Sequence, residues 1–257
     1  MAETWQYSSD WRQLGNTASQ KKGSIHDDGA AQNLGFRKAF VPGSVVANFA
    51  TPAILERFGN AWLENGWYDF NFVSPVYIDK DVHTLARDDE GEFICRVETR
   101  DGRLCAHATA GTGESLPWQT AGTLADVFPK ALIGTQFEKA ITIRREDAEP
   151  MLRASHDQSR QWLDYVPPEQ LMPIALHMID FKRIPLDAIQ HPGMWAQHAI
   201  ALRAPILWNA PYHVRESLAE KGISGRTQYV TFQFHVYDND NNEVAVGRHK
   251  CKFLRKP

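Results

Sequence analysis

The residues best suited to chemistry lie between Ser24 and Ser44, where a histidine and two carboxylates precede an apolar stretch. The ordinary pKa of a histidine is close to neutral, so His26 can accept and release a proton at physiological pH. Asp27 and Asp28 follow directly, and each can orient the imidazole or cap a helix. The pattern indicates an acid–base site; a histidine that only bonds the backbone beside a helix is the alternative.

Gly43 and Ser44 follow Pro42, a residue favoured at helix starts. The first N–H groups of a helix have no intrahelical acceptor and carry a partial positive charge. Backbone N–H groups of this kind stabilise a developing oxyanion without any particular side chain. We therefore expect an oxyanion site beside the proton carrier; a simple turn at Pro42–Gly43 is the alternative.

Helical spacing of apolar residues predicts a long helix from Pro42 to Phe58, ended by Gly59. Pro52 removes one N–H within it and is expected to kink the axis. A short helical turn is predicted over residues 26–36, capped by Asp27 or Asp28.

Strands are predicted over residues 68–73, 93–99 and 104–108 because apolar and polar residues alternate there. Asp101-Gly102 separates the last two and predicts a hairpin. Near the C-terminus, strict alternation from Val230 to Tyr237, a polar turn and a return through Val246 predict another hairpin.

The second half repeats the order of the first, with an apolar helix predicted from Pro167 to Ile179. The matched positions are His26-Asp27 with His156-Asp157 and Pro75 with Pro205, all 130 residues apart, and Trp67 with Trp195, two residues off that register.

A unit with one long central helix followed by antiparallel strands predicts an α+β fold, with a curved sheet wrapped around the helix. We expect an N-terminal unit over residues 1–120, a linker over 121–135 and a C-terminal unit over 136–257. Residues 1–23 form an arm that packs its aromatic side chains. The four tryptophans at 62, 67, 195 and 208 are expected in the core, with the lining of an acyl pocket as the alternative.

The overall composition of the chain argues against several classes of protein. The net charge of −3 gives no electrostatic reason to bind nucleic acid. No apolar stretch of roughly 18 residues could span a membrane, and the N-terminus lacks the pattern of a signal peptide. The three cysteines, Cys95, Cys105 and Cys251, form no Cys-x-x-Cys pair and predict buried, reduced thiols in a cytoplasmic protein. No zinc-type spacing and no phosphate-binding glycine motif is present, so we expect neither a metal nor a cofactor.

The N-terminal motif resembles that of the MaoC-like branch of the hotdog superfamily, whose pattern is Asp-x-Asn-Pro-x-His-x-Asp, then Ala, Gly-Phe and an Ile-x-His-Gly at a helix start. The residues that match it are His26, Asp28, Ala31, Gly35, Phe36 and Gly43. The resemblance covers residues 20–110, and 140–257 mainly through the repeat. It implies a double hotdog, in which two fused units join their sheets edge to edge. Such relatives hydrate or dehydrate acyl thioesters of coenzyme A or acyl carrier protein with an Asp–His pair, and bind the thioester oxygen where Gly43 and Ser44 stand.

The chain departs from this family pattern at the position of the catalytic aspartate. Lys21 stands where the catalytic Asp is expected, Gly23-Ser24 replaces Asn-Pro, and Pro42 replaces the histidine of the His-Gly step. Met151 occupies the acid position of the second half, so the usual pair is absent from both halves.

The resemblance therefore implies a cofactor-free lyase of the hydratase/dehydratase type, acting on an acyl thioester through an enolate-like intermediate. His26 is the expected proton carrier, with Asp27 or Asp28 as its partner and the amides of Gly43 and Ser44 as the oxyanion hole. The alternatives are a hotdog thioesterase, for which Glu56 is the one acid on the central helix, and a non-catalytic subunit that binds an acyl ligand or an active partner. The expected partner is a small-molecule acyl thioester, with a homodimer as an open alternative to a single chain; neither nucleic acid nor a membrane is expected.

Overall fold

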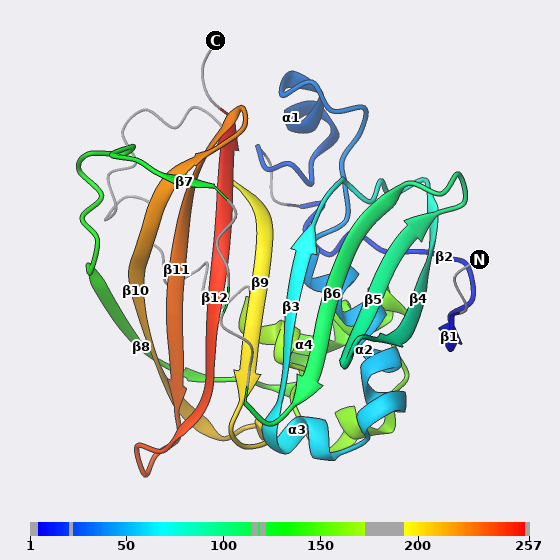
Figure 1. Cartoon of the computed structure of the whole chain (residues 1–257), viewed down its shortest axis with the longest axis vertical. Coiled ribbons are helices and arrows are strands. Elements are labelled where there is room, and N and C mark those ends of the chain that lie inside the picture. The colour runs from blue at the N-terminus through cyan, green and yellow to red at the C-terminus, as the bar shows by residue number, and fades with distance from the viewer. Residues whose placement is uncertain (1–4, 21–22, 115–117, 119–121, 173–192, 255–257) are drawn as a thin grey trace.

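The chain builds one large antiparallel sheet with its helices packed beside it (Figure 1). The computed structural model describes residues 5–20, 23–114, 118, 122–172 and 193–254. The strands are β1 (Tyr7–Ser8), β2 (Arg12–Gln13), β3 (Gly66–Phe72), β4 (Asp81–Asp89), β5 (Glu92–Thr99), β6 (Leu104–Thr112), β7 (Thr123–Leu124), β8 (Gln136–Thr142), β9 (Met194–Leu202), β10 (Pro211–Ser224), β11 (Thr227–Tyr237) and β12 (Glu243–Leu254).

The strand order shows two units joined at one edge. The main path is β1-β4-β5-β6-β3-β9-β12-β11-β10-β7, with β2 on β4 and β8 on β10. Strands β3 and β9 come from different halves of the chain and pair antiparallel at the centre of the sheet. The edge-to-edge junction expected of a double hotdog is thereby confirmed.

The predicted hairpins are present. β5 and β6 pair around Asp101-Gly102, and β11 and β12 pair around residues 238–242. The inward-facing residues Val230, Phe232, Phe234 and Val236 are almost fully buried, as their alternation predicts. A further hairpin, β4–β5, turns at Glu90-Gly91 and was not predicted from the sequence.

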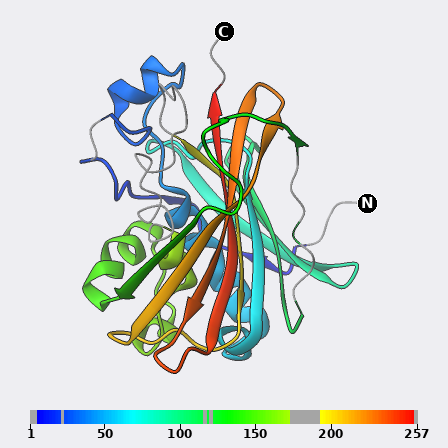
Figure 2. The ribbon, with the colours of Figure 1, turned by 90° about the vertical axis from the view of Figure 1, so that its left-hand side faces the viewer.

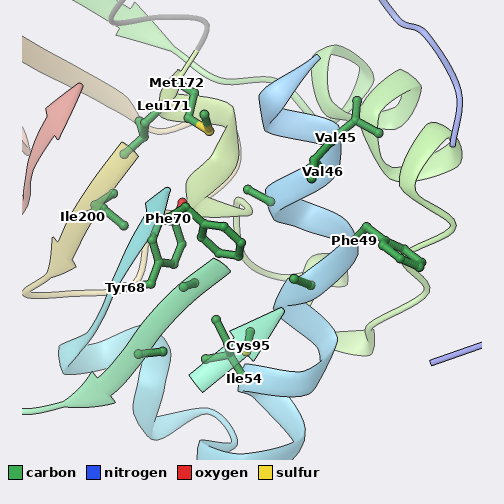
Figure 3. Packing of buried hydrophobic residues seen from close by; sticks show 14 of the residues in the cluster. Val45, Val46, Phe49, Ile54, Tyr68, Phe70, Cys95, Leu171, Met172 and Ile200 are labelled. Atoms are coloured by element: carbon green, nitrogen blue, oxygen red, sulfur yellow. The ribbon is translucent and has the colours of Figure 1, made fainter. Parts of the chain in front are cut away.

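The central helix α2 spans Gly43–Phe58, the bounds that the apolar spacing predicts. Pro42 precedes it, and Gly59 ends it in a left-handed conformation with φ of 62°. Eleven of its sixteen residues are buried, because the helix is enclosed on nearly all sides. Figure 3 shows Ile54 of this helix beside Cys95 of the sheet, with Tyr68 and Phe70 on the same side, whereas Phe49 points to the opposite side of the helix.

Three further helices accompany α2: α1 (Asp28–Asn33), α3 (Ala61–Asn65) and α4 (Arg145–Ser155). Figure 2 shows α1 and α4 on the same side of the sheet. Helix α4 was not predicted, because its sequence is mostly polar and contains Pro150. Short 3-10 helices cover Arg160–Leu163 and Pro168–Gln170. The predicted helix from Pro167 is described only as far as Met172; its remainder lies outside the described residues.

The N-terminal arm packs its aromatic residues, as expected. Trp11 stacks on His83 with ring centroids 3.8 Å apart, and the Arg87 guanidinium lies 5.0 Å from the Trp5 ring. The predicted linker is not merely a connection: β7 pairs with β10, and Phe128 is buried in the second unit.

All three cysteines are buried in strands β5, β6 and β12 and form no disulfide. Burial raises the pKa of each thiol, so these side chains behave as small apolar groups. None of the helices in the described ranges is long and apolar enough to cross a membrane.

Candidate functional site

A cavity of about 340 Å³ lies where the loop between α1 and α2 meets the junction of the two halves. The first half lines it with His26, Gly43 and Phe72, and the second half contributes Trp195 and Lys252. The site is therefore built from both units, at the end of the sheet where α1 lies in Figure 1.

His26 is half-buried, and its Nδ1 lies 2.7 Å from the Phe40 carbonyl oxygen. A carbonyl oxygen only accepts, so Nδ1 is the donor, and whenever the ring is neutral its lone pair lies on Nε2. The Asn16 amide donates to the His26 carbonyl oxygen at 2.9 Å and holds the backbone. A neutral imidazole in this tautomer is suited to accept a proton through Nε2.

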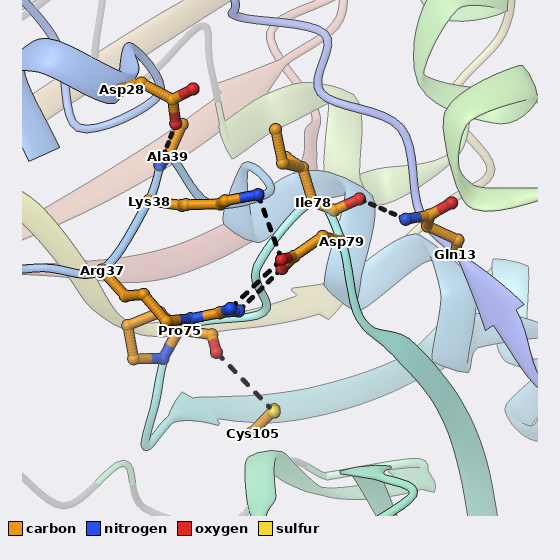
Figure 4. Close-up of polar contacts among 9 residues, drawn as sticks. All are labelled: Gln13, Asp28, Arg37, Lys38, Ala39, Pro75, Ile78, Asp79 and Cys105. Atoms are coloured by element: carbon orange, nitrogen blue, oxygen red, sulfur yellow. Dashed lines mark hydrogen bonds and ion pairs between the residues drawn. The ribbon is translucent and has the colours of Figure 1, made fainter.

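Asp27 and Asp28 hold backbone amides. The Asp27 side chain caps α1 by accepting from the Ala30 N–H at 3.0 Å, the capping role that the sequence offers as an alternative. Asp28 accepts from the Ala39 N–H at 2.7 Å, as Figure 4 shows. Both carboxylates fold the loop that carries His26. The expectation of a carboxylate partner for the imidazole is not supported by these bonds.

The same loop is tied at two points to the segment between β3 and β4. The Val41 N–H donates to the Val76 carbonyl at 2.8 Å. Arg37 and Lys38 both reach the Asp79 carboxylate, at 2.7 and 3.2 Å (Figure 4). The exposed ion pairs contribute little stability, whereas the backbone bond fixes where α2 begins.

At the start of α2, Gly43 lines the cavity, whereas Ser44 is buried and is not among the lining residues. The N–H groups of Val45 and Val46 donate to the Pro42 carbonyl, which leaves Gly43 and Ser44 as first-turn amides without an acceptor inside the helix. Gly43 is packed tightly: a Cβ added there would lie 3.0 Å from Trp195 Cε3 and 3.2 Å from Phe72 Cζ. Both aromatic rings therefore lie directly against the start of α2.

Among the described residues that line the cavity, the ionisable side chains are His26, Cys105 and Lys252, and none is a carboxylate. Burial raises the pKa of the Cys105 thiol, which keeps it neutral. A lysine and a helix N-terminus together favour negative charge in the cavity. The arrangement suits a ligand with an anionic or developing anionic oxygen.

The other histidine of the repeat lies elsewhere. His156 is exposed at the C-terminal end of α4, with φ of 59° and its Nε2 3.1 Å from the Gln13 carbonyl. Trp62 and Trp67 are buried in the core, whereas Trp195 lines the cavity, so the two expectations for the tryptophans each hold for some of them. Glu56 is exposed near the far end of α2.

A buried polar network, which sequence reasoning missed, joins α2 to the second half. The Asn48 amide donates to Asp157 Oδ2 at 3.0 Å, and its Oδ1 accepts from Ser155 Oγ at 2.6 Å. Asp157 also accepts from Trp162 Nε1 at 2.7 Å. The only signal for this role in the sequence is the repeat, which makes Asp157 equivalent to Asp27.

Glu169 completes the network and is fully buried. Thr51 Oγ1 donates to its Oε1 at 2.6 Å. Burial raises the pKa of Glu169 to about 7, against the lowering effect of the Thr51 bond. Burial also raises the pKa of Asp157. These hydrogen bonds connect Asn48 and Thr51 of α2 to Asp157 and Glu169 of the second half.

A second missed pair lies on the inner face of the second half. His198 Nδ1 and His249 Nδ1 are 3.1 Å apart, and both rings are fully buried. Burial lowers the pKa of His249 to about 3 and that of His198 well below its ordinary value, so both are neutral. Over the described ranges, no three metal-ligating side chains gather into a metal site.

No protein-family model matches the chain, and no curated protein matches it. Several solved structures are similar to the chain. A protein described as a MaoC domain dehydratase from Chloroflexus aurantiacus has a TM-score of 0.65 at 10% identity and covers 99% of this chain and 97% of its own. A Mycobacterium tuberculosis protein described as having a double hotdog fold has a TM-score of 0.62 at 11% identity, over 98% and 97%. The dehydratase domain of PpsC from the same organism, in complex with C12:1-CoA, has a TM-score of 0.54 at 14% identity, over 84% and 85%.

These similarities and the β3–β9 junction define the chain as a double-hotdog protein of the α+β class. The structures that it resembles include MaoC-like dehydratases, as the N-terminal motif predicts.

Proposed function

We propose that this protein is a hydratase/dehydratase-type lyase that binds an acyl thioester in the cavity between its halves. The observation that carries the proposal is that His26 and Gly43 at the start of α2 line the same cavity. The similarity to MaoC-like dehydratases, one of them in complex with an acyl-CoA, supports a thioester ligand.

In the proposed reaction, the thioester oxygen lies at the amide of Gly43, the first-turn residue of α2 that lines the cavity. His26 Nε2 takes a proton from the carbon next to the carbonyl, and the electron pair moves to the oxygen to form an enolate. Preorganised N–H donors stabilise this charge. The enolate then re-forms the carbonyl and expels the hydroxyl of the neighbouring carbon, which leaves as water with the proton that His26 returns.

A single proton carrier is sufficient for this sequence, because the proton removed from carbon is the one delivered to the leaving hydroxyl. The reverse reaction hydrates a 2-enoyl thioester. The proposal therefore does not need the missing acid, and it agrees with a lining that contains no carboxylate in the described residues. Asp27 and Asp28 act in it as positioning residues for the His26 loop.

The test is turnover of a panel of enoyl- and 3-hydroxyacyl-CoA thioesters by the whole chain. His26→Asn should lower kcat by about 10²- to 10⁴-fold, the usual contribution of a general acid–base group. The matched control is His156→Asn at the repeat-related position, where asparagine tolerates the left-handed backbone. This variant should retain wild-type turnover.

Wild-type turnover by His26→Asn would contradict the mechanism. Binding of thioesters by the wild-type chain with no turnover of any member of the panel would favour the non-catalytic acyl-binding subunit. Release of free coenzyme A would favour the thioesterase instead.

A further inference from the structure

Two aromatic side chains form the wall between the cavity and the core. Phe72 and Trp195 both line the cavity, one from each half. Each has a fully buried ring behind it. Phe72 stacks on Phe70 with ring centroids 6.3 Å apart, and Trp195 meets His249 edge to face at 4.8 Å.

The same rings are pressed against the start of α2. The position that a Cβ of residue 43 would occupy lies 3.0 Å from Trp195 Cε3 and 3.2 Å from Phe72 Cζ. In the proposed complex, the thioester oxygen binds the Gly43 amide beside these rings, and the adjacent acyl carbons contact the indole. The large coenzyme or carrier group must leave through the open side of the cavity, so the acyl chain is directed at this wall.

The size of the cavity agrees with a short chain. Its volume of about 340 Å³ is near the lower end of the range of roughly 300–1,000 Å³ for small-molecule sites. Part of this volume must hold the thioester and the end of its carrier arm.

Building on the proposed thioester site, we propose that Trp195 is a specificity-determining residue that limits the bound acyl group to a short chain. Phe72 completes the wall on the side of the first half. The substrates are accordingly short-chain acyl thioesters, and removal of the indole extends the cavity toward His249.

The test measures binding rather than turnover. Calorimetric titration of the whole chain with butyryl-, octanoyl- and dodecanoyl-CoA, which are saturated and cannot be dehydrated, gives the dependence of affinity on chain length. The wild-type protein should bind butyryl-CoA at least tenfold more tightly than dodecanoyl-CoA. In Trp195→Ala this ratio should fall by tenfold or more, because each methylene that becomes buried improves binding roughly fourfold.

Trp195→Val serves as a second variant in case the alanine variant does not fold, since it keeps an apolar side chain at the wall. Trp208→Ala is the matched control: Trp208 is also partly buried but does not line the cavity, and it should keep the wild-type ratio. Circular dichroism confirms that each variant is folded.

Binding of dodecanoyl-CoA as tightly as butyryl-CoA by the wild type would overturn this inference alone. An unchanged ratio in folded Trp195→Ala or Trp195→Val would do the same and leave the thioester site standing. If the wild-type chain binds none of the three thioesters, both this inference and the proposed function fail.

Discussion

Asp69 of β3 and Ala199 of β9 lie directly opposite each other at the middle of the junction between the two halves. They are 130 residues apart, as are His26 and His156. A residue that faces its own repeat equivalent marks the two-fold axis relating two copies of a unit. The sheet register therefore agrees with the spacing of 130 residues in the sequence repeat.

The two copies differ where the chemistry is proposed. The bond from the Val41 N–H to the Val76 carbonyl recurs as Val166 to Ile206, both at 2.8 Å. Val166 is 125 residues after Val41, so the loop after His156 is five residues shorter than the loop after His26. The shorter loop leaves His156 at the surface and brings Asp157 against α2.

The buried contact between the halves predicts a stability effect. Asn48→Ala removes a donor from Asp157, which keeps the bond from Trp162 Nε1, and an acceptor from Ser155, which keeps the Leu152 carbonyl. We expect a loss of about 1–3 kcal/mol in the free energy of unfolding, because two buried hydrogen bonds are removed at roughly 0.5–1.5 kcal/mol each. Urea denaturation measures this loss. Asn239→Ala, in an exposed turn, is the control and should change stability by less than about 0.5 kcal/mol.

The buried carboxyl group of Glu169 should make the stability of the protein depend on pH. Its pKa rises from 4.5 to about 7 on folding because of burial, so the folded state binds the proton more tightly than the unfolded state. Its contribution to stability is then complete below pH 4.5 and is lost as the pH rises toward 7. Glu169→Gln loses hydrogen bonds but does not titrate.

The stability difference between wild type and Glu169→Gln should therefore shrink as the pH is raised through this window. Urea denaturation of both proteins at a series of pH values measures this difference in stability. The two proteins share all their other titrating groups, so the effects of those groups largely cancel in the difference. A difference that stays constant with pH would show that Glu169 does not titrate as its burial predicts.

Much of the fold could be predicted because local patterns and global structure agree. The apolar spacing from Val45 to Phe58 gives α2 its bounds, and the alternation around Phe232 gives its strand its buried face. Trp67 and Trp195, matched two residues off the repeat register, take different places: Trp67 packs beside Ala201 at the junction, whereas Trp195 lines the cavity. Helix α4 has too few apolar residues to be recognised by periodicity.

The site was predicted less completely for a physical reason. His26 and the helix start are close in sequence, so a local motif identifies them. Trp195 and Lys252 reach the cavity only through the pairing of distant strands, which no local pattern encodes. The buried roles of Asn48 and Glu169 likewise depend on contacts over more than one hundred residues.

The close packing of Gly43 predicts that Gly43→Ala weakens ligand binding. The added methyl group meets Trp195 and Phe72 and pushes them into the cavity. We expect the affinity for butyryl-CoA to fall by roughly tenfold, about 1.4 kcal/mol, while alanine itself favours the helix. Calorimetric titration measures the loss.

Combining Gly43→Ala with Trp195→Ala should restore part of that affinity, because one of the two clashing rings is then absent. Such non-additivity is the signature of contact between two positions. Strictly additive losses would contradict a direct effect of residue 43 on the indole.

Asp27 allows its capping role to be separated from a catalytic role. Its carboxylate accepts from the Ala30 N–H at 3.0 Å, and asparagine caps helices as well as aspartate does, whereas alanine costs about 1 kcal/mol. Asp27→Asn should therefore keep both the stability and the thioester turnover of the wild type. Asp27→Ala should lose stability by about that amount, measured by urea denaturation, and its turnover should fall because the loop carrying His26 loosens. If Asp27→Asn instead lost turnover as severely as His26→Asn while remaining folded, the carboxylate would be part of the chemistry, and the single-carrier mechanism would have to include it as the second proton-transfer group.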